Sequence, residues 1–270
     1  MLVSVVTFIL ASAGGVKWAG LVLFSIAAYL VVGGCGAVNC YYDRDIDAAM
    51  DRTARRAIPT GRVAASKALA VGIALITVGL TATYALFGAM TLAMVALGAA
   101  FYLLVYTVWL KRTSRWNVLI GAVSGGFAAT AGWAATGASI TLVPILIGLL
   151  DVVWTPGHLW SLAIKRVDEY KKAGVPMLPT RSGIGYASRF VLIFNSATVA
   201  FSFVFTLIGE TGLIYTAVAA ACGAWLLWKS VKLYRNPSAH LGHEAYIASM
   251  PYLAALMVGF LLDRIVTLLF

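Results

Sequence analysis

The sequence predicts an all-α membrane protein, folded as a single domain over residues 1–270, with about nine transmembrane helices in one bundle around a central chamber that opens to the cytoplasmic side. The chain is 61% hydrophobic and only 11% charged, and its mean hydropathy is +0.92, values that soluble proteins do not approach. Apolar runs of about twenty residues, long enough to cross a bilayer as helices, are separated by short polar links. We find no period-two alternation of the kind that a membrane barrel requires.

The predicted spans are residues 2–13, 21–38, 68–87, 90–110, 118–136, 140–164, 190–208, 213–231 and 246–267. Their number places the amino terminus inside the cell and the carboxyl terminus outside. The first span is short for a bilayer. We therefore expect it to be tilted, or to extend through Gly14 and Gly15 to Val16, unless the start of the chain has been trimmed.

The basic residues define the predicted topology. The net charge is +10, yet all but two of the 20 Lys and Arg residues, the exceptions being Lys17 and Arg264, lie on alternate loops. The positive-inside rule places those loops in the cytoplasm. The charge therefore indicates a protein of the cell membrane, with membrane lipid around it and active-site loops on the cytoplasmic side, and no nucleic-acid partner. The sequence leaves the oligomeric state open.

An acidic stretch, N-C-Y-Y-D-R-D-I-D-A-A-M-D, follows the second predicted span. If the helix continues through it, Asn39, Asp43, Asp47 and Asp51 lie one turn apart on one face. Stacked like charges repel, so we expect a cation to hold them together. Carboxylates and an amide suit Mg²⁺, which completes its shell with water or phosphate oxygens. The alternative is a solvated acidic loop that caps a helix.

Two long cytoplasmic loops resemble each other. One contains I-P-T-G at residues 58–61 and the other M-L-P-T-R-S-G at residues 177–183, with four helices between them. This spacing suggests two related half-bundles that face each other. A second acidic pair, Asp168 and Glu169, would then lie opposite the first. A chance resemblance between loops that contain Pro and Gly stays open.

The interiors of the helices carry almost no charge, which argues against an ion or proton pathway. Asp151, within the sixth span, is the exception. It could lie at a wet cavity or bond to a neighbouring helix, or it could supply polarity within a substrate chamber. Aromatic residues near the inner helix ends fit an interfacial belt, although some could line a pocket that stabilises a cation.

The motif Asn39-x3-Asp43-x3-Asp47, followed by R-T-x-x-R at residues 52–56 and by Pro59, resembles the UbiA-type membrane prenyltransferases, which attach isoprenoid tails to aromatic acceptors. Two further segments, W-T-P-G-H-L-W-S-L-A-I at residues 154–164 and D-E-Y-K-K-A-G-V-P-M-L-P at residues 168–179, are similar to the haem O synthase (protoheme IX farnesyltransferase) branch of that superfamily. The resemblance covers almost the whole chain.

The sequence departs from this branch at several positions. Gly157 stands where the branch usually has proline, Leu159 where it has phenylalanine, and Ala57 follows Arg56 in place of proline. Glu169 occupies an acidic position where aspartate is usual, although Asp168 is adjacent. A basic K-P-R-like element before the first helix is missing, which places part of the diphosphate site in doubt.

The resemblance implies that farnesyl is transferred from farnesyl diphosphate to a vinyl group of haem B, giving haem O and diphosphate, with Mg²⁺ as cofactor. It implies a role for each group of residues: catalysis for Asn39, Asp43 and Asp47; metal binding for Asp43, Asp47, Asp168 and Glu169; diphosphate binding for Arg52, Arg56, Lys111, Arg112 and Lys165; and the haem side for His158, Trp154 and Asn117.

His158 has two functional roles under this resemblance, because imidazole ligates haem iron or hydrogen-bonds a propionate. A structural histidine, capped by a backbone carbonyl near a kink at Pro156, is the alternative. For the whole protein, a quinone-type or lipid-type prenyltransferase would share Asn39, Asp43 and Asp47 without the signature at residues 154–179. A small transporter and a binding or scaffold protein are the alternatives outside the enzymes.

Overall fold

The computed structural model describes residues 1–12 and 15–269, with side chains to residue 266, and this part of the chain contains helices and no strand. The helices are α1 (Leu2–Ala11), α2 (Trp18–Tyr42), α3 (Arg44–Ala49), α4 (Ala65–Ala100), the π-helix η1 (Phe101–Leu110), α5 (Lys111–Thr113), α6 (Asn117–Gly121), α7 (Val123–Ala134), α8 (Leu142–Lys165), α9 (Val167–Lys172), α10 (Leu178–Ser182), α11 (Ile184–Ser202), α12 (Val204–Leu207), α13 (Leu213–Arg235) and α14 (Ala239–Leu269). The all-α prediction is confirmed.

Each predicted span overlaps helix, but the ends differ. Residues 68–87 and 90–110 belong to one helical run, Ala65–Thr113, which breaks at Gly88 (φ 79°, ψ −176°). Within the described residues, six helices are long and apolar enough to cross a membrane. The number of nine transmembrane helices therefore stays a prediction. Val16 is not helical, which rules out the extension of the first helix to that residue. Ala13 and Gly14 lie outside the described residues.

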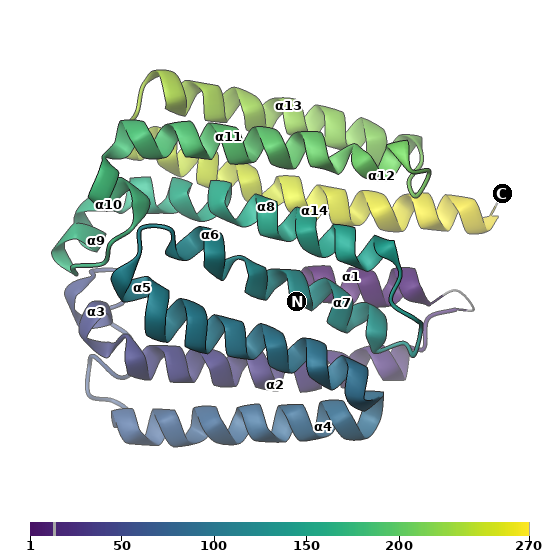
Figure 1. The fold of residues 1–270 in the computed structure, drawn as a ribbon, viewed down its shortest axis with the longest axis horizontal. Helices are drawn as coiled ribbons and strands as arrows, with labels where there is room; N and C mark the ends of the chain where they lie inside the picture. The colour runs from purple at the N-terminus through teal and green to yellow at the C-terminus, as the bar shows by residue number, and fades with distance from the viewer. Residues whose placement is uncertain (13–14, 270) are drawn as a thin grey trace.

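The long helices run side by side in one bundle (Figure 1). Helices α2 and α4 pack along each other at one side, α11, α13 and α14 group at the other, and α8 lies between, in contact with α7, α11 and α14. Glycines permit the close approach of α2 and α4: a Cβ on Gly34 would lie 2.6 Å from the carbonyl oxygen of Gly72. Such small residues let helices in membranes approach backbone to backbone.

Buried side chains form three apolar clusters between the helices. The first surrounds Leu150 and Leu256, the second surrounds Trp160 and Leu178 near the helix ends that carry α9 and α10, and the third contains Phe8 and Phe24. Many large apolar side chains remain exposed on the outer surface. Such an outer surface suits a lipid environment, and the polar residues turned inward are the candidates for a functional region.

Gly157, one of the departures from the resembled branch, has a packing explanation. A Cβ at this position of α8 would lie 2.0 Å from Oδ1 of Asn195 on α11, whose amide nitrogen donates to Ser230 Oγ at 2.8 Å. The glycine thus makes room for a buried hydrogen bond between α11 and α13. Adding even one methyl group must displace Asn195.

Gly157→Ala is therefore expected to lower the thermal stability of the protein in detergent, by about 1–3 kcal/mol for an overpacked core site. The matched control is Gly185→Ala in α11, where no neighbouring atom lies within 4 Å of the added Cβ. Adding Asn195→Ala should recover part of the loss. Equal melting temperatures for the two Gly→Ala variants would show that the contact with Asn195 has no energetic consequence.

Candidate active site

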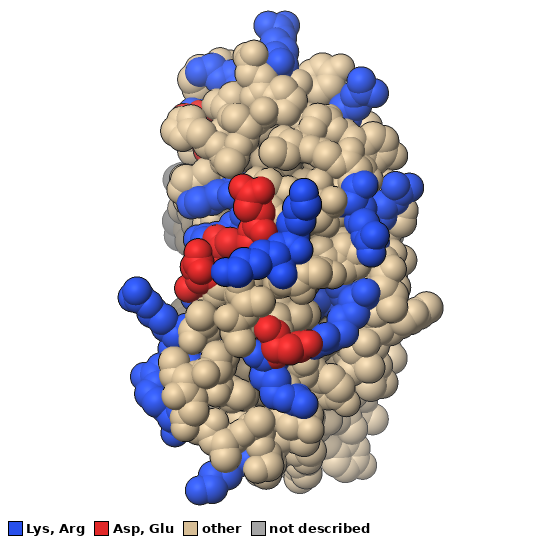
Figure 2. Space-filling model, turned by 90° about the vertical axis from the view of Figure 1, so that its left-hand side faces the viewer, with Lys and Arg blue, Asp and Glu red and all other residues tan. Residues whose placement is uncertain are grey.

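The short helices α3, α5, α9 and α10 lie together at one end of the bundle, on the left in Figure 1. Figure 2 views this end and shows acidic side chains near its middle, bordered by Lys and Arg. The two long loops that the sequence analysis paired thus meet at the same face of the protein. The candidate site is built where this face meets the helices beneath it.

Asn39, Asp43 and Asp47 follow one another in helical register, as predicted. The backbone nitrogen of Asp43 donates to the Asn39 carbonyl at 2.8 Å, and that of Asp47 donates to the Asp43 carbonyl at 2.7 Å. All three side chains are buried, with exposed fractions of 8%, 0% and 4%. Asp51 departs from the prediction, because the backbone becomes extended at Met50 and leaves Asp51 exposed in a turn.

Asp43 is the centre of a buried polar cluster. Its Oδ2 accepts from the Asn39 amide at 2.8 Å and pairs with the Lys111 ammonium, while the same amide donates to Thr107 Oγ1 at 3.1 Å. Its Oδ1 is buried and has no hydrogen-bond partner. An unpartnered carboxylate oxygen in such a place is costly unless a cation meets it. The donor set of hard oxygens fits Mg²⁺.

Asp47 is held by the segment that follows it. Arg56 donates to Asp47 Oδ2 at 2.8 Å, and Thr53 Oγ1 donates to the Asp47 carbonyl at 3.0 Å. The R-T-x-x-R motif thus folds back over the carboxylate and brings Arg56 to the site. Arg52 is exposed in the same turn.

Arg112 takes a different position from the one expected of a free diphosphate ligand. Its guanidinium donates to both carboxylate oxygens of Asp45, at 2.6 and 2.8 Å, and to the Tyr42 carbonyl at 2.6 Å. These charge-assisted bonds hold the pKa of Asp45 well below its usual range. Arg112 is therefore engaged beside the Asn39–Asp47 face rather than free within it.

The second acidic pair lies on α9 but does not join the first as one ligand group. Asp168 is exposed, and Glu169 pairs with Arg166 through Oε1 while its buried Oε2 has no hydrogen-bond partner. Within residues 1–12 and 15–269, no three His, Cys, Asp or Glu side chains gather closely enough to hold a metal ion. The two loops still lie at the same end of the bundle (Figure 1).

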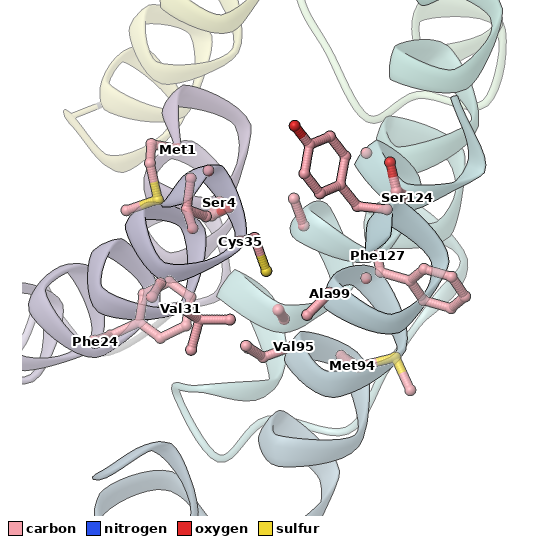
Figure 3. Close-up of a pocket in the computed structure, with 18 residues that line it drawn as sticks. Met1, Ser4, Phe24, Val31, Cys35, Met94, Val95, Ala99, Ser124 and Phe127 are labelled. Carbon is pink, nitrogen blue, oxygen red and sulfur yellow. The ribbon is translucent and has the colours of Figure 1, made fainter. Parts of the chain in front are cut away.

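An apolar cavity of about 420 Å³ lies beneath the polar cluster, between α1, α2, α4, η1 and α7. Figure 3 shows Phe24, Val31 and Cys35 on one wall, opposite Val95 and Ala99. Phe24, Val31, Cys35 and then Asn39 repeat along one face of α2, so that face leads from the cavity floor to Asp43. Tyr102 lines the cavity, and its backbone carbonyl accepts a hydrogen bond from Thr107 Oγ1 at 3.0 Å. Because Thr107 Oγ1 also accepts from Asn39, Tyr102 and Thr107 connect the cavity wall to the polar cluster.

The residues expected on the acceptor side lie on the α8 side of the site. His158 stacks on Trp154, and its Nδ1 lies 2.7 Å from Ser249 Oγ of α14. Asn117 is fully buried, and neither atom of its side-chain amide has a hydrogen-bond partner. Asp151 points at Gly125, a cavity-lining residue, where an added Cβ would lie 2.3 Å from its Oδ2.

Sequence reasoning missed two residues of the site. Thr107 bonds Asn39, and its signal was a lone polar residue in the otherwise apolar run F-Y-L-L-V-Y-T-V-W-L. Tyr246 stacks on the free face of His158 with ring centroids 4.6 Å apart. Nothing in the sequence linked Tyr246 to residues so far away in the chain.

A helical membrane bundle with buried carboxylates above an apolar cavity suits an enzyme for a substrate with a phosphate head and an apolar tail. The chain belongs to the UbiA prenyltransferase family, whose sequence model matches residues 1–256. The resemblance inferred from the motifs is therefore confirmed, and the protein is a prenyltransferase.

Three relatives with similar sequences are all protoheme IX farnesyltransferases. The chain is 40% identical to protoheme IX farnesyltransferase 1 of Cenarchaeum symbiosum, with 88% of this chain and 80% of the relative covered. It is 41% identical to protoheme IX farnesyltransferase of Desulforudis audaxviator (88% and 75% covered) and 36% identical to that of Stutzerimonas stutzeri (98% and 88% covered).

Solved structures share the fold. A UbiA homologue from Aeropyrum pernix, in its apo form, superposes with a TM-score of 0.76 at 19% identity, covering 97% of this chain and 96% of that one. A homologue from Archaeoglobus fulgidus, bound to DMAPP and Mg²⁺, superposes with a TM-score of 0.70 at 18% identity, covering 96% and 95%. At these identities the likeness concerns the fold alone.

Proposed function

We propose that this prenyltransferase moves the farnesyl group of farnesyl diphosphate to a vinyl group of haem B, giving haem O and diphosphate. The observation that carries the proposal is the unpartnered Oδ1 of buried Asp43, in a polar cluster that Thr107 connects to Tyr102 in the wall of the apolar cavity. The names of the relatives support haem as the acceptor. Quinone-type and lipid acceptors are the competing outcomes.

Asp43 and Asp47 would hold Mg²⁺, which when bound neutralises diphosphate and makes it a better leaving group. Asn39 orients Asp43 through its amide, and Lys111 lies against the same carboxylate. Lys111 and Arg56, which pair with Asp43 and Asp47, and Arg52 from the same turn as Arg56 would neutralise the phosphate oxygens. Charge that develops as the allylic C–O bond breaks is stabilised by these preorganised groups.

The apolar cavity would take the farnesyl tail. Tyr102 lines it and stacks on Tyr106 with ring centroids 5.8 Å apart. Lys111, the partner of Asp43, places its Nζ 5.9 Å from the centroid of the Tyr106 ring. The faces of the two tyrosine rings would stabilise the allylic cation left when the C–O electrons leave with diphosphate. The vinyl π electrons then form the new C–C bond, water adds to the resulting cation beside the porphyrin, and one water proton is released. The transfer needs no nucleophilic side chain.

Val95→Trp is expected to shorten the prenyl chain that the protein accepts. Val95 lines the cavity seven residues before Tyr102, roughly 10 Å further from the polar cluster along the helix. A large ring there leaves room for geranyl diphosphate but not for farnesyl diphosphate. The ratio of the two kcat/KM values should therefore reverse by about tenfold, the effect of losing one to two kcal/mol of apolar contact.

The control for this experiment is Leu97→Trp, at a residue that is 46% exposed on the outer surface. That variant should keep the wild-type ratio. An unchanged ratio in Val95→Trp would place the prenyl tail elsewhere.

The polar end of the bundle is proposed to face the cytoplasm of the cell. Thr60 and Lys172 are exposed there, whereas Ser139 is exposed in the link between α7 and α8. In a background that lacks the three native cysteines, Thr60→Cys and Lys172→Cys should resist an impermeant thiol reagent in sealed cells, while Ser139→Cys reacts. Labelling of Thr60→Cys or Lys172→Cys in sealed cells would show that the polar end of the bundle faces the outside of the cell.

Release of diphosphate tests the function as a whole. Purified protein should release it only when farnesyl diphosphate, haem B and Mg²⁺ are all present, and removal of Mg²⁺ by a chelator should stop it. Equal release without haem B would mean that haem is not the acceptor.

A further inference from the structure

The His158 ring is held between two aromatic rings from different helices. Trp154 of α8 stacks on one face, with ring centroids 4.3 Å apart and an angle of 18° between the ring planes. Tyr246 of α14 stacks on the other face, with ring centroids 4.6 Å apart and an interplanar angle of 28°. Both faces are covered, so the imidazole can offer only its edges to another group. One edge, Nδ1, is occupied by Ser249 Oγ at 2.7 Å.

The hydrogen bonds of Ser249 decide where the proton of His158 lies. Ser249 Oγ is also 2.7 Å from the Tyr246 carbonyl oxygen, which can only accept, so the single hydroxyl hydrogen is donated there. The remaining contact of Oγ must then be an acceptor contact. His158 Nδ1 therefore carries the hydrogen and donates it to Ser249, and the lone pair of the neutral ring is on Nε2.

The second edge of the ring is free to meet a substrate. Within the described residues, the one hydrogen bond of the His158 ring is at Nδ1, which leaves Nε2 unbonded. The backbone of Ser249 is fixed as well, because its carbonyl accepts from Trp154 Nε1 at 2.9 Å. The ring is thus preorganised in one orientation and one tautomer.

We propose that Ser249 is a positioning residue that holds His158 in the Nδ1–H tautomer, so that Nε2 ligates the iron of an iron-porphyrin acceptor. The inference rests on the proposed function and decides between the two roles that the sequence left open for His158. A hydrogen bond donated to a propionate would need a proton on Nε2, which the neutral ring with its hydrogen on Nδ1 does not carry. Metal-ligating histidines characteristically donate through the other ring nitrogen in this way.

The test is a titration of the full-length protein in detergent with ferric haem B and, separately, with metal-free protoporphyrin IX. Ser249→Ala removes the acceptor for Nδ1–H and frees the tautomer. It should weaken haem binding by about 10- to 100-fold, the usual effect of losing a hydrogen bond to a metal ligand. Binding of the metal-free porphyrin should not change, and Ser249→Thr, which keeps the hydroxyl, should bind haem like wild type.

The spectrum of bound haem supplies the second readout. Wild type should show the absorbance of nitrogen-ligated iron, and His158→Ala should lack it. Equal losses for haem and metal-free porphyrin in Ser249→Ala, or no loss for either, would overturn the proposal. So would haem bound to wild type without a nitrogen-ligated spectrum; formation of farnesylated haem in that case would leave the proposed function standing, whereas a protein that neither binds nor farnesylates haem would end both.

Discussion

Asp43→Asn is expected to lower prenyl transfer by about 10³-fold, the effect of removing a charged group that acts on the transition state. The variant keeps the size and shape of the side chain, but its neutral amide lacks the negative charge that would hold Mg²⁺ beside the unpartnered Oδ1. The measurement is product formation at saturating farnesyl diphosphate and haem. Asp47→Asn should also lower the rate of prenyl transfer.

Stability must be measured alongside, because Asp43 is fully buried and pairs with Lys111. Removing one partner of such a pair costs about 3–5 kcal/mol, since it leaves the other charge uncompensated. The double variant Asp43→Asn with Lys111→Met should therefore melt closer to wild type and still lack activity. Asp51→Asn, an exposed carboxylate of the same segment, should be active. Wild-type turnover in Asp43→Asn would end the assignment of the metal site.

His158→Ala is expected to weaken haem binding by at least roughly 100-fold while Mg²⁺-dependent binding of farnesyl diphosphate stays near wild type. The reason is spatial. His158 lies in a stack between α8 and α14. Asp43 lies at the end of α2, bonded to Asn39 and paired with Lys111 of α5. The Asp43→Asn variant should show the reverse pattern.

Two titrations on each variant measure the two affinities. Haem binding is followed by absorbance, and farnesyl diphosphate binding in the presence of Mg²⁺ is followed by calorimetry. Phe201, a partly buried aromatic residue of α11, offers a size-matched control in Phe201→Ala, which should change neither affinity. If His158→Ala bound haem like wild type, the histidine would have no acceptor role.

Local patterns in the sequence were enough to predict the part of the site that one helix builds. Asn39, Asp43 and Asp47 lie one turn apart, and the helical backbone bonds that join them follow from that spacing. The same reasoning failed at Asp51. A single extended residue, Met50, ends the helical register, and the periodicity of the charges contains no information about that backbone break.

The remaining features depend on contacts between segments far apart in the chain. Lys111 reaches Asp43 because the run before it is a π-helix, a winding that apolar periodicity does not reveal. Whether Glu169 approaches the first acidic group depends on how two loops fold over the same end of the bundle. The stack on His158 likewise needs α14 to lie against α8.

The central claim is that haem is the acceptor, and the mass of the product tests it most directly. Purified protein would be incubated with farnesyl diphosphate, Mg²⁺, haem B and an equimolar quinone precursor, and all products identified by mass spectrometry. The account predicts haem that has gained one farnesyl group and one hydroxyl, with the quinone precursor unchanged. Farnesylated quinone precursor beside unmodified haem would contradict it.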